Sequence, residues 1–385
     1  MVWRVVSIGI VLLLIISTSY AAESEQCSLR VGKLLQQLEN SLNEDSEANL
    51  LPQLTQFMSR YPDEKHSLLF YYLGNQYAKA QQPTKALAAY RQALDLNDQQ
   101  PWLWQNYAKI AWDLRKYKIA AIALEQADTL KPDVNIYFHA AVANIHAKQG
   151  DKALDMLEAL IVRAKENSAD SWLETYVDQC QQHNDVTRGL VSLQQWKPWL
   201  EEHREFWYLL AILHIQAQQY QQAVANLQVL ESLGPLNKSR KELMANLLLQ
   251  VKVPVRSAQL YQQLVDEYPM NQRYMSQLVT AYRLSLQPEK ALNIVEKAIR
   301  TTPNVKWLKI KGELCFDLNK FKEAFQAFAG VLKLEPKTGS AYLYQGYCAL
   351  QMDDKALAHT VLTQALNFRK EKKEARRLLD WLHKT

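Results

Sequence analysis

The sequence is poor in the residues that build flexible connections and strongly charged surfaces. Its 385 residues include only 10 glycines and 12 prolines, so long flexible linkers are not expected. The formal net charge of +5 is small for this length and argues against the basic face of a nucleic-acid-binding protein. The sequence contains no HExxH, no glycine-rich phosphate loop, no CxxC and no G-x-S-x-G. We therefore expect no catalytic site, no metal centre and no cofactor.

What the sequence does contain is a repeat with a period of about 34 residues. A small residue recurs at this interval along almost the whole chain, in the series Ala86, Ala120, Ala153, Gly189, Ala223, Ser257, Ala291, Ala324 and Ala358. Large apolar residues and prolines form two further series in phase with the first. Self-similarity at this period predicts an array of helical repeats, in which each unit buries its core only against its neighbours.

Residues 101–132 show the physical basis of one repeat. Apolar residues at positions 104, 107, 108 and 111 have helical spacing, a polar turn follows at 115–118, and a second apolar stripe ends before Pro132. Two amphipathic helices joined by a short turn form an αα-hairpin. Alanines on both helices allow the two axes to approach closely.

These units resemble the tetratricopeptide repeat (TPR), which combines W-x2-L-G-x2-Y, A-x3-F and a terminal proline. The closest matches are Leu73-Gly74-x-x-Tyr77 for the first helix, and Ala324-x-x-x-Phe328 with Pro336 for the second. About ten units are counted on this pattern. They begin near residues 31, 67, 101, 134, 169, 204, 238, 272, 305 and 339. The resemblance implies an all-α, right-handed TPR-like solenoid with a partner-binding concave groove.

Residues 1–21 predict a secretory signal peptide. Arg4 precedes an apolar run over residues 5–16, and Ser19-Tyr20-Ala21 provides small residues for cleavage after Ala21. The run is short for a membrane span, which needs about 20 apolar residues, but an uncleaved anchor remains the alternative. We expect an exported, periplasmic protein that touches a membrane only if this segment is uncleaved.

The repeat pattern also predicts how the remaining chain is organised. In chain order we expect a degenerate capping repeat at 22–66, an N-terminal array at 67–168, a degenerate repeat at 169–203, a C-terminal array at 204–370 and a capping helix at 371–385. In the degenerate repeat, Gly189 replaces the usual alanine, and Trp196-Lys197-Pro198-Trp199 is expected to interrupt the second helix. This repeat is expected to be a bend between the N-terminal and C-terminal halves of the array. In the capping helix, Ala375, Leu378, Leu379 and Leu382 are expected to face the last repeat.

Two of the four cysteines, Cys315 and Cys348, lie one repeat apart on the first helices of neighbouring units. A disulfide between them requires Cα atoms within about 7 Å. Cysteine is also among the residues most often buried without a bridge. We favour buried packing residues, and the disulfide stays open at this point.

The resemblance implies that positions 2, 5, 9 and 12 of each first helix line the groove. On the N-terminal side these positions are Tyr71, Asn75, Trp102, Gln105, Lys109, Trp112 and Phe138. Aromatic rings beside amides and a lysine suit an extended or helical peptide, although Trp112 and Phe138 have core packing as the alternative.

Further along, the same positions change in character. The central set is apolar and predicts a partner surface, through Leu173, Val177, Tyr208, Ile212, Ile215 and Leu249. The later set is basic, through Arg273, Arg283, Lys306 and Lys309, and suits an acidic segment unless these are solvated charges. Glu125, Asp128, Glu158 and the basic residues of 369–377 are expected to be solvated helix faces.

Together these features predict a non-catalytic periplasmic TPR scaffold that binds a protein or peptide partner, and no nucleic acid. The layout is also similar to the TPR proteins that accompany TonB–ExbB–ExbD-type systems, an impression carried by residues 207–210, 234–236 and 243–249. The partner is then part of an inner-membrane or periplasmic complex in envelope assembly or energy transduction. The alternative is an accessory protein of peptidoglycan or polysaccharide machinery, with Trp102, Trp112 and Tyr208 stacking on sugars.

Overall fold

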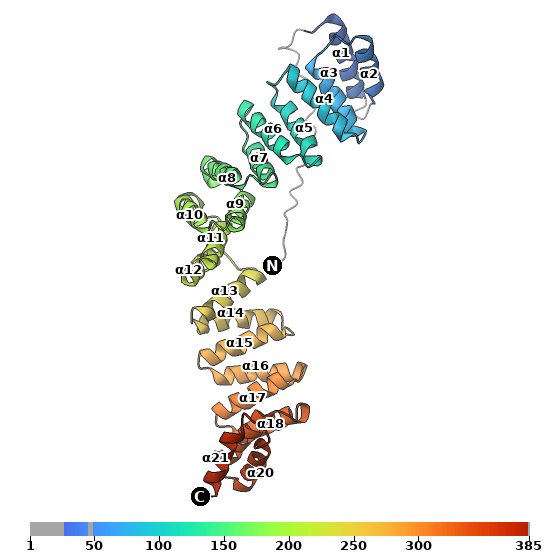
Figure 1. The fold of residues 1–385 in the computed structure, drawn as a ribbon. Coiled ribbons are helices and arrows are strands. Elements are labelled where there is room, and N and C mark those ends of the chain that lie inside the picture. The colour runs from blue at the N-terminus through green and yellow to red at the C-terminus, as the bar shows by residue number, and fades with distance from the viewer. Residues whose placement is uncertain (1–26, 45–48, 384–385) are drawn as a thin grey trace. The chain divides into compact units, whose positions relative to one another are not determined.

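The structure, a computed structural model, describes residues 27–44 and 49–383. Within these ranges every regular element is a helix, so the predicted all-α architecture is confirmed (Figure 1). The predicted signal peptide lies outside the described residues. The chain divides into two compact units, residues 1–209 and 210–385, and helix α11 (Arg204–Gln216) contributes to both.

The first unit contains ten complete helices in the part of the chain that the structure describes, together with a short 3-10 helix at Lys165–Asn167. They are α1 (Leu29–Glu44), α2 (Leu51–Arg60), α3 (Ser67–Lys79), α4 (Pro83–Leu96), α5 (Pro101–Asp113), α6 (Tyr117–Leu130), α7 (Val134–His146), α8 (Gly150–Ala164), α9 (Asp170–Gln182) and α10 (Val186–Leu200).

The second unit continues the same pattern of paired helices. After α11 they are α12 (Tyr220–Ser232), α13 (Lys238–Gln250), α14 (Pro254–Glu267), α15 (Gln272–Leu284), α16 (Pro288–Thr301), α17 (Val305–Asp317), α18 (Phe321–Leu334), α19 (Gly339–Gln351), α20 (Lys355–Ala365) and α21 (Lys372–Leu382).

The helix boundaries follow the predicted repeat closely. The first helix of a pair begins at the predicted residue in α3, α5, α7, α11, α13, α15, α17 and α19, whereas α9 begins one residue later and α1 two residues earlier. These boundaries agree because polar turns and N-terminal prolines such as Pro101 end the hydrophobic periodicity at the same places.

The series of small residues marks the packed side of the second helices. Ala86 and Ala324 are 0 % exposed, Ser257 is 0 % exposed and Gly189 is buried. A small side chain at this position lets the second helix lie close against the first. The predicted role of the series in close packing is confirmed.

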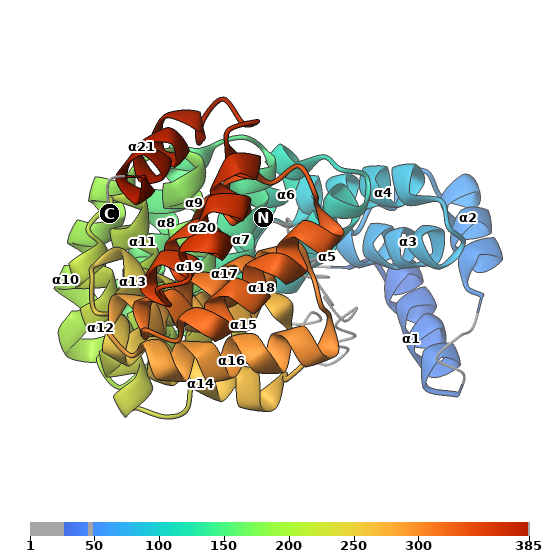
Figure 2. The same cartoon turned by 90° about the horizontal axis from the view of Figure 1, so that it is seen from below.

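Each unit is built as two layers. Consecutive first helices touch through pairs such as Tyr71 with Trp102, and consecutive second helices through pairs such as Glu125 with Lys152. Within a repeat the two helices lie side by side, as α3 and α4 do in Figures 1 and 2. We call one surface of each unit its first-helix face. It is the outer side of the layer that the first helices make, which are α3, α5, α7 and α9 in the first unit and α13, α15, α17 and α19 in the second.

The turns inside the repeats share one backbone geometry. From α3 to α20, each pair is joined by three residues whose middle one has a positive φ, from 55° to 61°. The residue after it donates its N–H to the carbonyl five residues earlier at 2.8–3.0 Å, as Gln82 does to Tyr77. This is a Schellman closure, and it satisfies carbonyls at the end of the first helix.

Pro198 does not interrupt its helix, so the prediction of a break was wrong. Helix α10 continues through it to Leu200. The proline lies in the last turn, where it removes one hydrogen bond. Trp196 and Leu200, which flank it, are 2 % and 0 % exposed, and their burial favours continuing the helix. A bend at 169–203 stays a prediction.

The C-terminal helix covers the end of the second unit as predicted. Ala375 and Leu379 of α21 join the buried cluster of α19 and α20, and Leu378 and Leu382 pack against it. The apolar face of this helix is therefore used inside the chain, and its charged face remains outside.

Candidate partner-binding surface

The predicted groove residues of the first unit fall into two groups. Tyr71 and Phe138 are each only 5 % exposed and belong to the core. Tyr71 packs edge-on against Trp102 with ring centroids 4.6 Å apart, and Phe138 lies 6.0 Å from Trp172. Core packing, the alternative for Phe138, is thus what the structure has, and Tyr71 shares it because both rings fill the space between consecutive first helices.

The other predicted residues form a half-buried row on the first-helix face. Trp102, Gln105, Lys109 and Trp112 lie on one side of α5, and Asn75 lies on the neighbouring α3. The indole N–H of Trp102 donates to Gln100 at 3.0 Å, and Lys109 Nζ lies 3.9 Å from Asp113. These side chains keep part of their surface in solvent.

Beneath this row lies a group of buried phenols. The Tyr90 hydroxyl donates to Asn75 Oδ1 at 2.5 Å, and its ring is 0 % exposed. Burial raises the pKa of Tyr90 and of Tyr71, against the opposing effect of a hydrogen bond between Tyr71 and Asn75. Both phenols stay neutral at physiological pH, so the charge of this part of α5 comes from Lys109 and its partner Asp113.

The predicted apolar strip in the middle of the chain was wrong at two positions. Leu173 is 0 % and Val177 is 1 % exposed. Leu173 and Val177 belong to a wide buried side of helix α9, which also contains Trp172 and Tyr176. Tyr208 on α11 is half-buried.

Two of the four predicted basic residues of the second unit form ion pairs between first helices, and a third forms a hydrogen bond there. Arg273 on α15 lies 2.7 Å from Glu242 on α13, and Arg283 lies 3.1 Å from Glu313 on α17. Lys306 donates to the Ser276 hydroxyl at 2.9 Å. These contacts hold consecutive repeats together and reduce the positive charge available to a partner.

Lys309 is half-buried on α17, and within residues 27–44 and 49–383 neither it nor Lys306 forms an ion pair. The carboxylates that pair with Arg273 and Arg283 are 31 and 30 residues away in the sequence, which is about one repeat. An acidic residue at this distance from a basic one is the sequence pattern that predicts such a pair.

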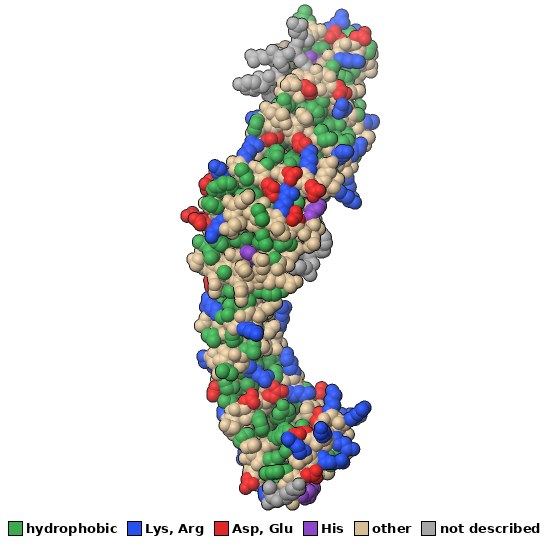
Figure 3. Space-filling view, turned by 60° about the vertical axis from the view of Figure 1, so that its left-hand side comes forward, with side chains coloured by type: hydrophobic (Ala, Val, Ile, Leu, Met, Phe, Trp, Pro, Cys, Tyr) green, Lys and Arg blue, Asp and Glu red, His purple; other side chains and the backbone are tan. Residues whose placement is uncertain are grey.

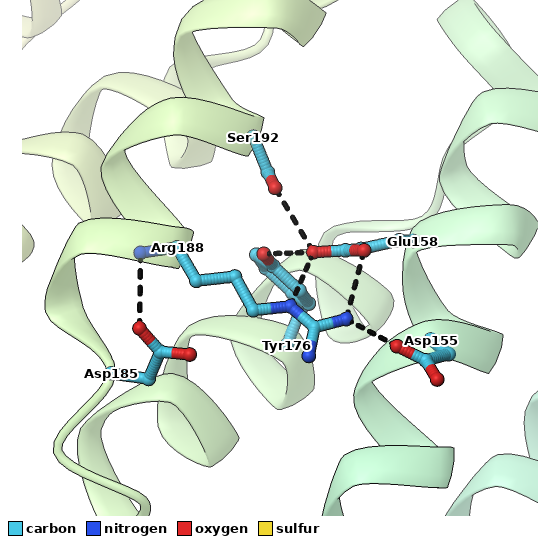
Figure 4. A network of polar contacts seen from close by, with 6 residues as sticks. All are labelled: Asp155, Glu158, Tyr176, Asp185, Arg188 and Ser192. Atoms are coloured by element: carbon cyan, nitrogen blue, oxygen red, sulfur yellow. Dashed lines mark hydrogen bonds and ion pairs between the residues drawn. The ribbon is translucent and has the colours of Figure 1, made fainter.

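Glu158 is not a solvated residue, as the sequence had suggested, but the centre of a network that joins α8, α9 and α10 (Figure 4). Arg188 binds both of its oxygens, with Nε at 2.8 Å and an Nη at 2.9 Å. The Tyr176 and Ser192 hydroxyls donate to it at 2.7 and 3.0 Å, and Asp155 accepts from Arg188 at 2.6 Å.

This network shifts the acidity of its members. Burial favours the neutral form of Glu158, but the hydrogen bonds from Arg188, Tyr176 and Ser192 outweigh it and lower the pKa of the carboxyl. Glu125 and Asp128 were also wrongly expected to be solvated. They pair with Lys152 and Arg163 of the next second helix.

Exposed cations gather near the C-terminal end of the chain (Figure 3). Six exposed residues contribute here: Arg369, Lys370, Lys372, Lys373, Arg376 and Arg377. Arg377 contacts Glu374, which also accepts a hydrogen bond from Tyr347 at 2.7 Å. The opposite side of α21 packs on the core, which fits the expected solvated helix face.

The cysteines are free: Cys27 is exposed, and Cys180, Cys315 and Cys348 are buried. The favoured interpretation of Cys315 and Cys348 as packing residues agrees with this burial. Among the residues that the structure describes, no three His, Cys, Asp or Glu side chains converge to hold a metal ion. Over the same residues, no helix combines the length and apolar character that a membrane crossing needs.

Comparison with known families identifies TPR repeats within the first unit. Two family profiles described as tetratricopeptide repeat match residues 68–110 and 103–134. These segments contain the half-buried row on α3 and α5. No curated protein matches the sequence. The matching family is a repeat family rather than a catalytic one, and it supports a scaffold that takes part in protein–protein interaction.

The chain is similar to solved structures at low sequence identity. The complex of Naa15 and Naa10 bound to HypK-THB has a TM-score of 0.51 and 14 % identity, over 91 % of this chain and 66 % of that one. MamA from Desulfovibrio magneticus RS-1 has a TM-score of 0.35 and 21 % identity, over 44 % of this chain and 96 % of that one. At 14 % identity the likeness to the Naa15 complex concerns the fold alone, which is a TPR-like solenoid.

Proposed function

We propose that this chain is a non-catalytic scaffold that binds a protein partner through the first-helix face of its first unit. The observation that carries the proposal is the half-exposed row Trp102, Gln105, Lys109 and Trp112 on one side of α5. Aromatic rings bury large areas at low entropic cost, and amide and ammonium groups add directional contacts. Packing within the chain leaves these side chains partly open, as a surface that gains contacts from a partner requires.

We further propose that the scaffold works in a Gram-negative periplasm, in envelope assembly or TonB-type energy transduction. The support is the signal-peptide pattern of residues 1–21 and the resemblance stated for residues 207–210, 234–236 and 243–249. Sequencing the N-terminus of the mature protein tests export. A start at Ala22 supports a cleaved signal, and an intact Met1 in membrane fractions supports an anchor.

A photo-crosslinking amino acid at Gln105 tests partner binding in cells. The matched control carries it at Gln92, which is exposed on α4 in the other layer. We expect a discrete crosslinked protein from Gln105 that is missing from Gln92. Identical products from both positions contradict the proposal.

The captured partner is then purified and its affinity is measured for Lys109→Glu. We expect a loss of about tenfold, since reversal replaces an attraction with a repulsion. Lys131→Glu makes the same charge change at an exposed residue that follows α6, and is expected to bind normally. Capture of peptidoglycan fragments in place of a protein supports the glycan alternative and counts against the scaffold.

A further inference from the structure

A hollow opens where two neighbouring turns of the first unit meet. It lies between the turn that joins α5 to α6 and the turn that joins α7 to α8, and its volume is about 400 Å³. Arg115 and Lys116 of the first turn, Lys148 of the second turn, Lys118 at the start of α6 and His146 at the end of α7 line it. It is thus set at the edge of the two layers, beside Trp112 of the first-helix face.

One wall of the hollow is formed by the rings of Tyr117 and His146, and Trp112, which does not line the hollow, packs against both. The rings of Tyr117 and His146 lie 4.9 Å apart, and Trp112 meets both edge-on, at 5.1 and 5.0 Å. The three rings come from α6, α7 and α5, so repeat packing holds them in place. Burial lowers the pKa of His146, which keeps its ring uncharged at physiological pH.

The rim of the hollow is positively charged. Arg115, Lys116, Lys118 and Lys148 are all exposed, and no acidic residue lines the hollow. Over the part of the chain that the structure describes, none of the four forms an ion pair with a carboxylate. The nearest acid in the sequence, Asp113, pairs with Lys109 instead.

The charge varies from one turn to the next along the repeat. The corresponding segments include the neutral Gln-Gln-Pro-Thr at 81–84, Leu-Gln-Pro-Glu at 286–289 and the basic Asn-Lys-Phe-Lys at 319–322, compared with Arg-Lys-Tyr-Lys at 115–118. The solenoid is built equally well with neutral residues at these positions. The basic rim therefore has no role that the fold itself requires.

We propose that this hollow binds an acidic segment of a protein partner, in which an aromatic side chain is flanked by aspartate or glutamate. The inference rests on the proposed function as a protein-binding scaffold. The basic rim selects the acidic groups, and the ring wall accepts a planar side chain by edge or face contacts. Five of the eight lining residues are exposed, so the hollow is open to solvent. An open site of this kind suits one side chain of a larger molecule better than a small ligand that must be enclosed.

The test uses the full chain and the fluorescein-labelled peptide Glu-Asp-Glu-Trp-Glu-Asp-Glu, with anisotropy as the readout. We expect binding that the double variant Lys116→Glu/Lys118→Glu weakens by about tenfold. Lys322→Glu/Lys337→Glu makes the same charge change at exposed residues of the second unit and is expected to bind normally. Far-UV circular dichroism and the urea midpoint of each variant confirm that it is folded.

The ring wall is tested separately. Replacing the peptide's tryptophan with glycine is expected to weaken binding to the wild type, and His146→Ala is expected to abolish that preference. No binding of the acidic peptide, or equal binding to both double variants, overturns the proposal. Binding of vesicles containing anionic lipid without binding of the peptide also overturns it, because the hollow then serves a membrane surface.

The experiments distinguish failure of the acidic-segment proposal from failure of the scaffold proposal. If the partner crosslinked from Gln105 binds Lys116→Glu/Lys118→Glu with unchanged affinity, the hollow is not its site and the scaffold stands. If Gln105 captures no protein, the scaffold itself fails, whatever the peptide does.

Discussion

The Tyr90 ring occupies the space that a Cβ atom on Gly74 would need. An ideal Cβ built there would lie 2.6 Å from Tyr90 Cε1. The ring is held in place because it is 0 % exposed and its hydroxyl bonds Asn75. Gly312 stands in the same relation to Phe328, so glycine on the first helix accompanies an aromatic ring on the second.

Gly74→Ala is therefore expected to destabilise the first unit by about 1–2 kcal/mol, because overpacking outweighs the gain in helix propensity. The measurement is urea unfolding followed by circular dichroism. Gly32→Ala is the matched control in the same unit, since its Cβ meets only Cys27 Sγ at 3.5 Å. Its stability should stay the same or rise. Equal effects from both variants would contradict the steric argument.

Leu286 has a φ of 56° although it is a leucine, and it is 87 % exposed. The left-handed conformation costs a side chain with a Cβ roughly 1–2 kcal/mol, and asparagine tolerates it better. Leu286→Asn is expected to raise the free energy of unfolding by about 0.5–1 kcal/mol. Urea midpoints measure the change.

The reciprocal control lies one repeat further along. Asn319 is exposed and has a φ of 58° in the corresponding turn. Asn319→Leu should lower the stability of the same unit by a similar amount. If both variants shift stability in the same direction, backbone conformation is not what distinguishes them.

The repeat could be predicted because it depends on steric features that the sequence states directly. A small residue such as Ala86 or Ala324 is needed wherever two helix axes approach, and its period survives substitution of the residues around it. The amphipathic spacing of residues 371–383 placed Ala375 and Leu379 on the core side of the capping helix.

Which side chains of the first-helix face are exposed could not be predicted in the same way. Position 5 or 9 of a first helix places a side chain toward the first-helix face. The exposed fraction of that side chain depends on the size of the side chains one repeat away. Tyr71 is covered by Trp102, and Leu173 is buried in the wide apolar side of α9. The positive backbone φ of the turns could not be predicted, because none of the nine residues that adopt it is a glycine.

The network around Glu158 predicts how the stability of the first unit depends on pH. The folded pKa of Glu158 is below the value of about 4.3 that glutamate has in an unfolded chain. The unfolded state therefore binds the proton more readily. The stabilisation is complete above about pH 5 and is lost as the pH falls through the unfolded and then the folded pKa.

Glu158→Gln is accordingly expected to lower stability by about 1–2 kcal/mol at pH 7, because Arg188 loses its charged partner. The difference from the wild type should shrink as the pH falls from 5 to 3. Urea unfolding across that range gives the comparison, with Glu202→Gln as the control at an exposed carboxyl. A difference that is independent of pH would show that the charge of Glu158 is not what stabilises the network.

The cysteines provide a direct test of how the second unit is packed. Cys315 and Cys348 are both 0 % exposed, and burial raises the pKa of both thiols, that of Cys348 to about 12. Burial also raises the pKa of Cys180 to about 11, whereas Cys27 is exposed. Because the thiolate is the reactive form, Ellman's reagent at pH 8 should label Cys27 quickly and the other three at least about a hundredfold more slowly.

Unfolding in guanidinium without a reductant should then release four thiols in total. A total of two would mean that Cys315 and Cys348 are bridged, and rapid labelling of three or four in the native protein would mean that the repeats around them are open.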